Sequence, residues 1–497
     1  MVWISLAMAA DRPDVGPFDR FRVEVANYPG AEASSELGSV LLAPPVEDIP
    51  FSVEEAPVPD TFVAEEAIEA IRIQPWHDAN ITGKGVRLAI FDVQWFGAML
   101  VDEELGEVNT WDCQAHRSCA IPMDTLRPRY TFEEGSHGVA CAEVVRDIAP
   151  GVELNLVRVN GQTTLENAAQ WAADEGIDVV SMSMSFFNNS YYDGGGAINA
   201  AVDRLRRGGV LLVNSAGNYA EEHWDADFWD PDADGDHNFP WGTSTLPVYY
   251  GAGDVTLYVS WDQFRSCGDT DLDAILYDSA GRVLGRADDI QDSEGKSCTP
   301  VERVSATIPE KGWYYLKVLR KSGDPHVRFA VFAREGAVWK PTPGSVADPA
   351  SSVSAWTVGA VRADGYLENE AESFSSHGPT HGGVEKPNIS GPDGLSSFTY
   401  GTVGFYGTSA STPAVAATVA LVMEAHPGWT AFDAADWMEA TALTERSVWG
   451  PADGELGVGK LRLPLPEAEG GGCQRGDGAA FLLLGLALPL RRRTALH

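Results

Sequence analysis

The stretch that decides the fold reads Gly407-Thr408-Ser409-Ala410-Ser411-Thr412-Pro413. Apolar residues follow it at helical spacing as far as Met423, so the sequence predicts a buried helix that begins near Ser409. Pro413 is expected in the first turn of this helix, where a missing N–H does no harm. A serine at the helix start lies beside the positive end of the helix dipole, which favours a reaction that generates negative charge. The alternative is an ordinary capping serine, because serine is a preferred N-cap residue.

Two further polar residues stand where regular elements end or begin. Residues 83–92 form a glycine turn and a short apolar run that ends on Asp92, which predicts a buried parallel strand. Ligands of open α/β sheets bind at the carboxyl ends of the strands, so Asp92 is a candidate functional carboxylate, with a loop-capping role as the alternative. His137 opens an apolar helix and is a candidate general base, although a structural histidine would fit the same position.

Strand and helix patterns alternate through much of the chain. This rhythm predicts an α/β fold with a doubly wound, mostly parallel sheet and helices on both faces. The expected strands are 152–159, 177–184, 210–213 and 353–361, and the expected helices are 164–174, 195–207 and 430–442.

The alternation of strand and helix patterns stops after Asn218, and a different residue pattern follows. Residues 245–335 contain five short runs rich in β-branched and aromatic residues, separated by turn residues. Such runs predict an antiparallel β-sandwich. Because the α/β pattern resumes near residue 346, we expect the sandwich to be inserted into the α/β sequence, as exposed loops tolerate.

An acidic loop precedes the predicted sandwich and reads Asp230-Pro231-Asp232-Ala233-Asp234-Gly235-Asp236. Alternating carboxylates around a glycine are typical of the opening of a calcium loop. Trp241 occupies the twelfth position, where such a loop needs a glutamate. Two interpretations stay open, a solvated acidic loop or a structural calcium site formed by Asp230, Asp232, Asp234 and Asp236.

The net charge bears on the kind of partner that the protein can bind, and the cysteines bear on its disulfide bonds. The 497 residues carry a formal net charge of −37, which excludes a nucleic-acid partner because phosphate binding needs a basic surface. Cys113 with Cys119, and Cys267 with Cys298, are candidate local disulfides in an exported protein. Cys141 falls in a predicted buried helix, where we expect it to fill space as a small apolar residue.

Four of these stretches, in this order, resemble the subtilisin-like serine peptidases, or subtilases. The similarity covers about 80–220 and 345–445, and the order Asp, His, Ser is that of subtilisin. An α/β-hydrolase motif, Gly-x-Ser-x-Gly, does not fit, since Ser411 stands at its fifth position. The resemblance implies hydrolysis of protein or peptide substrates with no required cofactor. The matching stretches are 83–92, 136–142, 210–218 and 407–413.

The resemblance also implies a role for each residue of the candidate site. Ser409 would attack the peptide carbonyl, and His137 would take its proton and later return it to the leaving amine. Asp92 would fix the imidazole tautomer, and Asn218 with the Ser409 N–H would stabilise the oxyanion. The strand that would pair with extended substrate carries Ser183 and Ser185. The alternative is a catalytically silent binding or scaffolding protein at the cell surface, against which the intact catalytic set argues.

The two ends of the chain suggest export. Residues 1–10 are apolar and resemble the tail of a signal peptide, and residues 11–75 are a candidate prosegment. At the other end, a glycine run with Cys473, an apolar run at 479–490 and three arginines resemble the C-terminal sorting tags of myxobacteria and their relatives. A secreted or surface-anchored protein is therefore expected, with membrane anchoring through this tail. The expected domains are a catalytic domain in two parts, 76–220 and 346–465, an insertion at 221–345 and the tail at 466–497.

Overall fold

The structure is a computed structural model. It describes the backbone of two short paired strands, β1 (Ala31–Ala33) and β2 (Val40–Leu42), and residues 63–95, 97–98, 101–113, 119, 135–187, 189–265, 268–291, 299–443 and 454–466. The chain divides into one unit of Met1–Leu465 and a tail unit of Pro466–His497. The predicted signal-peptide remnant, most of the candidate prosegment and the sorting tail with Cys473 lie outside the described residues.

A seven-stranded sheet forms the centre of the first unit, and all its pairings are parallel. The strand order is β18-β17-β7-β6-β3-β5-β4, so β3 lies inside the sheet with later strands on both sides. The predicted doubly wound α/β fold is confirmed. The strands are β3 (Arg87–Asp92), β4 (Val108–Asp112), β5 (Glu153–Arg158), β6 (Val179–Met182), β7 (Leu211–Ser215), β17 (Ala355–Arg362) and β18 (Ile389–Asp393).

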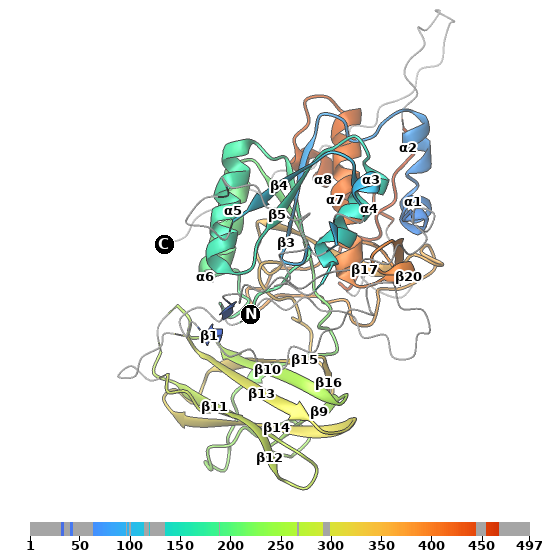
Figure 1. Ribbon diagram of the computed structural model, residues 1–497. Helices are drawn as coiled ribbons and strands as arrows, with labels where there is room; N and C mark the ends of the chain where they lie inside the picture. Colours follow the sequence, from blue (N-terminus) through green and yellow to red (C-terminus); the bar gives the residue numbers. More distant parts are fainter. Residues whose placement is uncertain are drawn as a thin grey trace, which may run out of the picture. The chain divides into compact units, whose positions relative to one another are not determined.

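Helices cover both faces of this sheet (Figure 1). Successive side chains of a strand point to opposite faces, so Leu88 and Ile90 of β3 enter one core and Ala89 and Phe91 the other. The first core is closed by α4 (His137–Ile148), α7 (Thr408–Ala425) and α8 (Ala431–Thr441), and the second by α5 (Gln162–Glu175) and α6 (Gly196–Arg207). The short helix α3 (Asp102–Leu105) lies before β4.

Two N-terminal helices also belong to this folded body. They are α1 (Glu65–Ile71) and α2 (Gln74–Asp78), and α1 falls within the stretch 11–75 that the sequence suggests as a prosegment. Ala67 and Ile71 are buried in the same core as α7, and the Trp76 Nε1 donates a hydrogen bond to the Pro464 carbonyl at 2.9 Å. Removal of residues up to 75 would therefore expose part of this core.

Two antiparallel sheets lie between β7 and β17 in the sequence and share one apolar core. Their strand orders are β13-β10-β15-β8 and β12-β11-β14-β9-β16, and we call residues 223–338 the inserted β-sandwich. The sequence predicted the five strands β10, β11, β13, β14 and β15, and it missed the other four. The strands are β8 (His223–Asp227), β9 (Leu246–Tyr250), β10 (Gly253–Trp261), β11 (Asp271–Tyr277), β12 (Val283–Ala287), β13 (Val301–Ile308), β14 (Gly312–Ser322), β15 (Arg328–Arg334) and β16 (Gly336–Val338).

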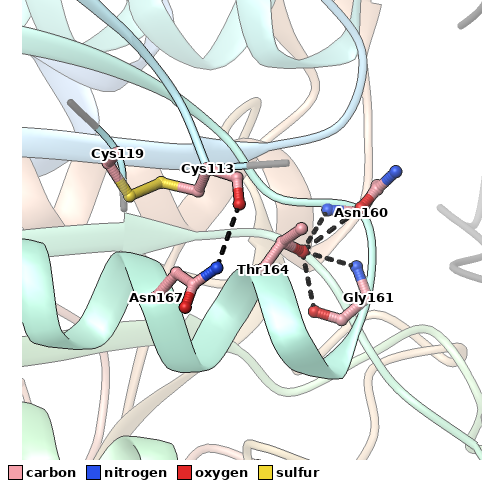
Figure 2. The surroundings of a disulfide bond; sticks show 6 residues. All are labelled: Cys113, Cys119, Asn160, Gly161, Thr164 and Asn167. Carbon is pink, nitrogen blue, oxygen red and sulfur yellow. Dashed lines mark hydrogen bonds between the residues drawn. A yellow bond between two sulfur atoms is a disulfide. The ribbon is translucent and has the colours of Figure 1, made fainter. Parts of the chain in front are cut away.

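One of the two candidate disulfides is formed. Figure 2 shows Cys113 bonded to Cys119, with the Cys113 carbonyl accepting a hydrogen bond from Asn167 of α5 at 3.3 Å. The bridge closes a short loop after β4, and the hydrogen bond from Asn167 ties the end of β4 to a helix on the second face of the sheet. Cys141 is free and buried in α4, as predicted. Cys267 and Cys298 lie outside the described residues.

Across the described part of the chain, no helix combines the length and the apolar character that crossing a membrane requires.

Candidate active site

A buried aspartate and histidine meet at the carboxyl end of the central sheet. Asp92 is the last residue of β3 and His137 the first of α4, and the His137 Nδ1 lies 2.7 Å from the Asp92 Oδ2. The other carboxylate oxygen accepts the backbone N–H groups of Val93 at 2.7 Å and Gln94 at 2.9 Å. Because an ionised carboxylate only accepts hydrogen bonds, the imidazole carries its proton on Nδ1. The basic nitrogen is therefore Nε2, which is buried and has no hydrogen-bond partner in the part of the chain that is described.

The glycine after the histidine allows this close approach. A Cβ at Gly138 would lie 2.8 Å from the Asp92 Cβ and 2.9 Å from the Gln94 carbonyl oxygen. The Gly138 N–H donates to that same carbonyl, also at 2.9 Å. Helix α4 can therefore begin directly against the loop after β3 only because residue 138 has no side chain.

Ser409 is the second residue of α7 and is 6% exposed. Gly407 precedes the helix with a φ of 97°, a conformation that glycine adopts without strain. A Cβ at Gly407 would also lie 2.6 Å from the Asn218 Nδ2, so glycine is needed there for a second reason. The N–H of Ser409 belongs to the first turn of the helix, whose N–H groups have no intrahelical partner.

Pro413 is the sixth residue of α7 and not part of its first turn, so the sequence prediction was wrong on this point. In the helix interior a proline removes the donor for the carbonyl four residues earlier, which here is the carbonyl of Ser409. That carbonyl instead accepts a hydrogen bond from the Ser183 hydroxyl at 3.1 Å, and the Cys141 Sγ lies 3.8 Å from it. The proline thus leaves the Ser409 carbonyl without a helical donor, and the side chains of Ser183, directly after β6, and Cys141 of α4 contact it instead.

These contacts join α4, which carries His137, to the start of α7, which carries Ser409, although no hydrogen bond links His137 Nε2 to Ser409 in the described residues. Cys141 lies four residues after His137, hence on the same face of the helix. The ligand atoms of Asp92, His137 and Cys141 all lie within 4.8 Å of one another, and Cys141 contacts the backbone of Ser409. The face of α4 that carries the histidine therefore faces the first turn of α7.

The side-chain amide of Asn218 contacts Thr408, the first residue of α7. Its Oδ1 accepts hydrogen bonds from the Thr408 N–H at 3.0 Å and the Thr408 hydroxyl at 2.9 Å. A backbone N–H can only donate, so the carbonyl side of the amide must face Thr408. The Nδ2 group is left as a donor close to Gly407, two residues before the candidate nucleophile. Thr408 and Cys141 are the two site residues that sequence reasoning missed, because a threonine and a buried cysteine carry no separate signal there.

Ser183 and Ser185, the predicted substrate-binding residues, are both buried. The Ser183 hydroxyl donates a hydrogen bond to the Ser409 carbonyl, and Ser185 lies beside the buried phenol of Tyr219. Both side chains thus have protein partners. The predicted pairing of substrate with the backbone of this strand stays a prediction.

The predicted calcium ligands are gathered only in part. Carboxylate oxygens of Asp230, Asp232 and Asp234 lie within 4.8 Å of one another. Asp236 instead forms an ion pair with Lys317 of β14. The Asp230 carboxylate also accepts the backbone N–H groups of Asp234 and Gly235, each at 3.1 Å, which explains the tight turn without an ion.

The fold and this site together define a class, the subtilisin-like serine peptidases. The chain belongs to the subtilase family, since the model described as "Subtilase family" matches residues 130–252 and 320–473. His137, Asn218 and Ser409 lie inside the matched ranges. The intervening residues belong to the inserted β-sandwich, and Asp92 lies before the first range.

Individual relatives agree with this assignment. The chain is 25% identical over 442 residues to the minor extracellular protease Vpr of Bacillus subtilis, an alignment that covers 78% of this chain and 52% of that protein. It is 39% identical over 98 residues to subtilisin E of the same species, covering 20% of this chain and 24% of that protein. The chain thus spans about half or less of the length of the curated relatives it matches.

Among solved structures, the CspB protease of Clostridium perfringens is similar, with a TM-score of 0.55 and 16% sequence identity. The match covers 80% of this chain and 97% of that chain. At this level of identity the similarity supports the fold alone.

Proposed function

We propose that the chain is an exported serine endopeptidase in which Ser409 is the nucleophile, His137 the general base and Asp92 the group that orients it. The observation that carries the proposal is the 2.7 Å bond between His137 Nδ1 and Asp92, which leaves a buried Nε2 on the face of α4 that contacts α7. A serine hydroxyl is a weak nucleophile at neutral pH, so a positioned base must remove its proton as the new bond forms.

The proton transfers follow from this arrangement. Nε2 of His137 would accept the Ser409 proton during attack on the peptide carbonyl, while Nδ1–H stays on the Asp92 carboxylate. The buried carboxylate, held by two backbone N–H groups, would stabilise the imidazolium that forms. The same Nε2–H would then protonate the leaving amine.

Negative charge on the tetrahedral intermediate would be stabilised by two donors. They are the Nδ2 group of Asn218, oriented by Thr408, and the backbone N–H of Ser409 in the first turn of α7. The positive end of the α7 dipole adds to this effect. Protein or peptide chains are the proposed substrates, bound in extended form beside the strand that carries Ser183 and Ser185.

Export rests on independent observations. The Cys113–Cys119 disulfide is typical of proteins in oxidising compartments, and one relative is named as an extracellular protease. The apolar first ten residues agree with this. Anchoring through the C-terminal tail rests on the sequence pattern around Cys473 alone.

The decisive experiment is covalent labelling with a fluorophosphonate probe. Wild-type protein, full-length and with the chain begun at residue 63 so that α1 is kept, should be labelled. Ser409→Ala should abolish the labelling. Ser411→Ala is the matched control, because Ser411 is buried in the same helix turn and should leave labelling unchanged. Folded protein that is not labelled in either form would favour the catalytically silent binding or scaffolding protein.

Calcium binding by the acidic loop is a separate proposal, supported by the three gathered carboxylates. Added Ca²⁺ should raise the melting temperature, since a ligand that binds only the folded state stabilises it. Asp232→Asn should abolish this rise, and Asp324→Asn, on an exposed loop of the sandwich, should not. An equal rise in both variants would remove the loop as the binding site. Differential scanning fluorimetry with and without chelator measures the effect.

A further inference from the structure

Two histidines and an aspartate meet where the inserted β-sandwich contacts the α/β part of the chain. His223 and Asp225 lie two residues apart on β8, an edge strand of the sandwich, so both side chains point to the same side. His381 comes from the loop between β17 and β18 of the central sheet. One ligand atom from each of the three lies within 4.8 Å of the other two, and the two imidazole rings are 5.5 Å apart.

The hydrogen bonds of the two imidazoles determine which nitrogen faces the cluster. The His223 Nδ1 lies 3.1 Å from the Thr342 carbonyl oxygen, and the His381 Nδ1 lies 2.9 Å from the Tyr191 carbonyl oxygen. A carbonyl can only accept, so each Nδ1 carries a hydrogen, and in a neutral ring each Nε2 then offers a lone pair. Histidines that bind metals are oriented by this same kind of Nδ1–H contact.

The Nε2 atoms of both histidines are unusual because buried polar atoms normally have a hydrogen-bond partner. They are buried, and neither has a hydrogen-bond partner among the described residues. Burial of an unpaired polar nitrogen costs free energy, so such atoms call for an explanation. The side chains of His223 and His381 are 0% and 2% exposed, respectively, so water cannot supply the missing partner.

The third group supplies negative charge. The Asp225 Oδ2 lies 3.9 Å from the His381 Nε2, and the carboxylate also forms an ion pair with Arg328. Arg328 is half exposed and approaches from the solvent side of β15. The buried Tyr191 hydroxyl has no partner in the described residues either, and its ring lies 4.4 Å from that of His381. The Asp225 Oδ2 also accepts hydrogen bonds from Arg328 Nε at 3.0 Å and from Nη2, so a metal ion at this oxygen would share it with the guanidinium.

We propose that His223, Asp225 and His381 bind a Zn²⁺ ion that fastens the inserted β-sandwich to the loop carrying His381. Two imidazoles and one carboxylate are a zinc ligand set, with a water molecule as the fourth ligand. Calcium and magnesium are less suited, because they prefer oxygen ligands throughout. The ion is separate from the candidate active site and does not depend on peptidase activity.

Two aromatic residues, Phe332 and Tyr219, connect this site to Asn218, the proposed oxyanion donor. His223 packs on Phe332 of β15 with ring centroids 4.7 Å apart, and Phe332 packs on Tyr219 at 5.9 Å. Tyr219 directly follows Asn218 in the chain. An ion that fixes β8 to the His381 loop would therefore stiffen the layer on which Asn218 rests.

The test is zinc binding by the full-length protein after treatment with a chelator. Competition with a chromophoric chelator should give one Zn²⁺ per chain, bound more tightly than about 1 μM. His223→Ala and His381→Ala should each weaken binding by more than the roughly 10- to 100-fold typical of outer-shell changes. His326→Ala is the matched control, since His326 is exposed on the same sandwich. Co²⁺ in place of Zn²⁺ should give the visible absorption of a four-coordinate ion in the wild type and in this control.

Three results would overturn the proposal. The first is folded wild-type protein that binds no Zn²⁺ at micromolar concentration and shows no Co²⁺ absorption. The second is binding that persists unchanged in His381→Ala. The third is binding that is lost in His137→Ala, which would place the ion at Asp92, His137 and Cys141 instead. Circular dichroism checks that each variant is folded. If an alanine variant does not fold, zinc binding by His381→Gln and the Co²⁺ spectrum of the wild type decide whether the ion binds at this site.

Discussion

At the scale of single residues, the candidate nucleophile is held by its backbone as much as by its side chain. Pro413 leaves the Ser409 carbonyl without a helical donor, and the Ser183 hydroxyl takes that place at 3.1 Å. Thr408, one residue before the nucleophile, orients the Asn218 amide through both its N–H and its hydroxyl. Each of these contacts joins residues far apart in the sequence, so each fixes where α7 begins relative to β6 and β7.

Ser183→Ala tests whether Ser183 supports the helix or binds substrate. We expect the free energy of unfolding to fall by about 1 kcal/mol, the usual net contribution of a hydrogen bond, with little change in KM. Urea denaturation and peptide hydrolysis measure the two quantities. Ser411→Ala is the control, because the buried Ser411 hydroxyl has no partner in the described residues and its loss should cost little. A large rise in KM without loss of stability would instead indicate a direct substrate contact.

Asn218→Ala tests the proposed oxyanion donor. Loss of such a donor costs subtilisin itself about 10²- to 10³-fold in kcat, and we expect a similar fall here with KM nearly unchanged, because the interaction strengthens only in the transition state. Steady-state hydrolysis of a peptide substrate measures both constants. A decrease in kcat of less than about 10-fold would argue against Asn218 as an oxyanion donor. Thr408→Val should lower kcat less, since the Thr408 N–H still orients the amide.

At the scale of elements, α4 connects the candidate base to the hairpin of β19 (Leu395–Ser397) and β20 (Gly401–Phe405). Glu143, in the middle of this helix, accepts hydrogen bonds from the Phe398 N–H and the Thr399 hydroxyl, both at 2.6 Å. Phe405 of the hairpin packs edge-on against the His137 ring, with centroids 5.8 Å apart. Glu143 thus holds the hairpin that closes one side of the imidazole.

The protonation of Glu143 should make stability depend on pH. Burial raises its pKa from 4.5 to about 8, so the folded protein keeps a proton that the unfolded chain loses. Stability from this group is complete below about pH 4.5 and is lost as the pH rises towards 8. The slope is at most about 1.4 kcal/mol per pH unit. Asp147 on the same helix, whose pKa burial raises to about 7, adds a loss in the same direction.

Glu143→Gln isolates this contribution, because glutamine has the shape of the protonated acid and cannot ionise. Urea denaturation at pH 5, 6, 7 and 8 should show a shallower decline for the variant than for the wild type. The Asp147 contribution is common to both proteins and cancels in the difference. Parallel declines would mean that Glu143 is ionised in the folded state at neutral pH.

At the scale of the whole folded unit, the inserted β-sandwich contacts the α/β part beside the candidate site. Phe187 and Tyr219 of the α/β part pack with Tyr258 and Phe332 of the sandwich in one buried cluster. Arg334, at the end of β15, lies 4.4 Å from the centroid of the Tyr219 ring and forms a buried ion pair with Glu222. The sandwich is therefore packed against the residue that follows Asn218.

A double-mutant cycle measures how strongly this ion pair joins the two parts. Arg334→Met alone should destabilise the protein by about 3–5 kcal/mol, because it leaves the Glu222 carboxylate buried without its partner. The double variant Arg334→Met/Glu222→Gln should recover part of the loss, since no buried charge remains. Thermal or urea denaturation of the four proteins gives the coupling. Equal losses in the single and double variants would show that the contact of Arg334 with Tyr219 matters more than the pair.

The sequence by itself determined the elements and residues whose signal is local. Alternating strands and helices, Asp92 at a strand end, His137 and Ser409 at helix starts and the five most regular sandwich strands were all predicted, because periodicity and caps report burial within one element. Strands with weak signals were missed, such as the polar β8 and the glycine-containing β12. The position of Pro413 within its helix was predicted wrongly because the first residue of a helix is hard to locate from sequence alone.

Only the tertiary structure decided which distant residues meet. Ser183 lies 226 residues from Ser409, whose carbonyl accepts its hydrogen bond. His223 belongs to the inserted β-sandwich, whereas His381 belongs to the loop between β17 and β18 of the central sheet. Similarly, Leu463, near the end of the first unit, donates its N–H to the carbonyl of Ile71, a residue of α1 that is buried in the core. Such contacts depend on how whole elements pack, and side-chain periodicity along one element carries no information about the partner on another.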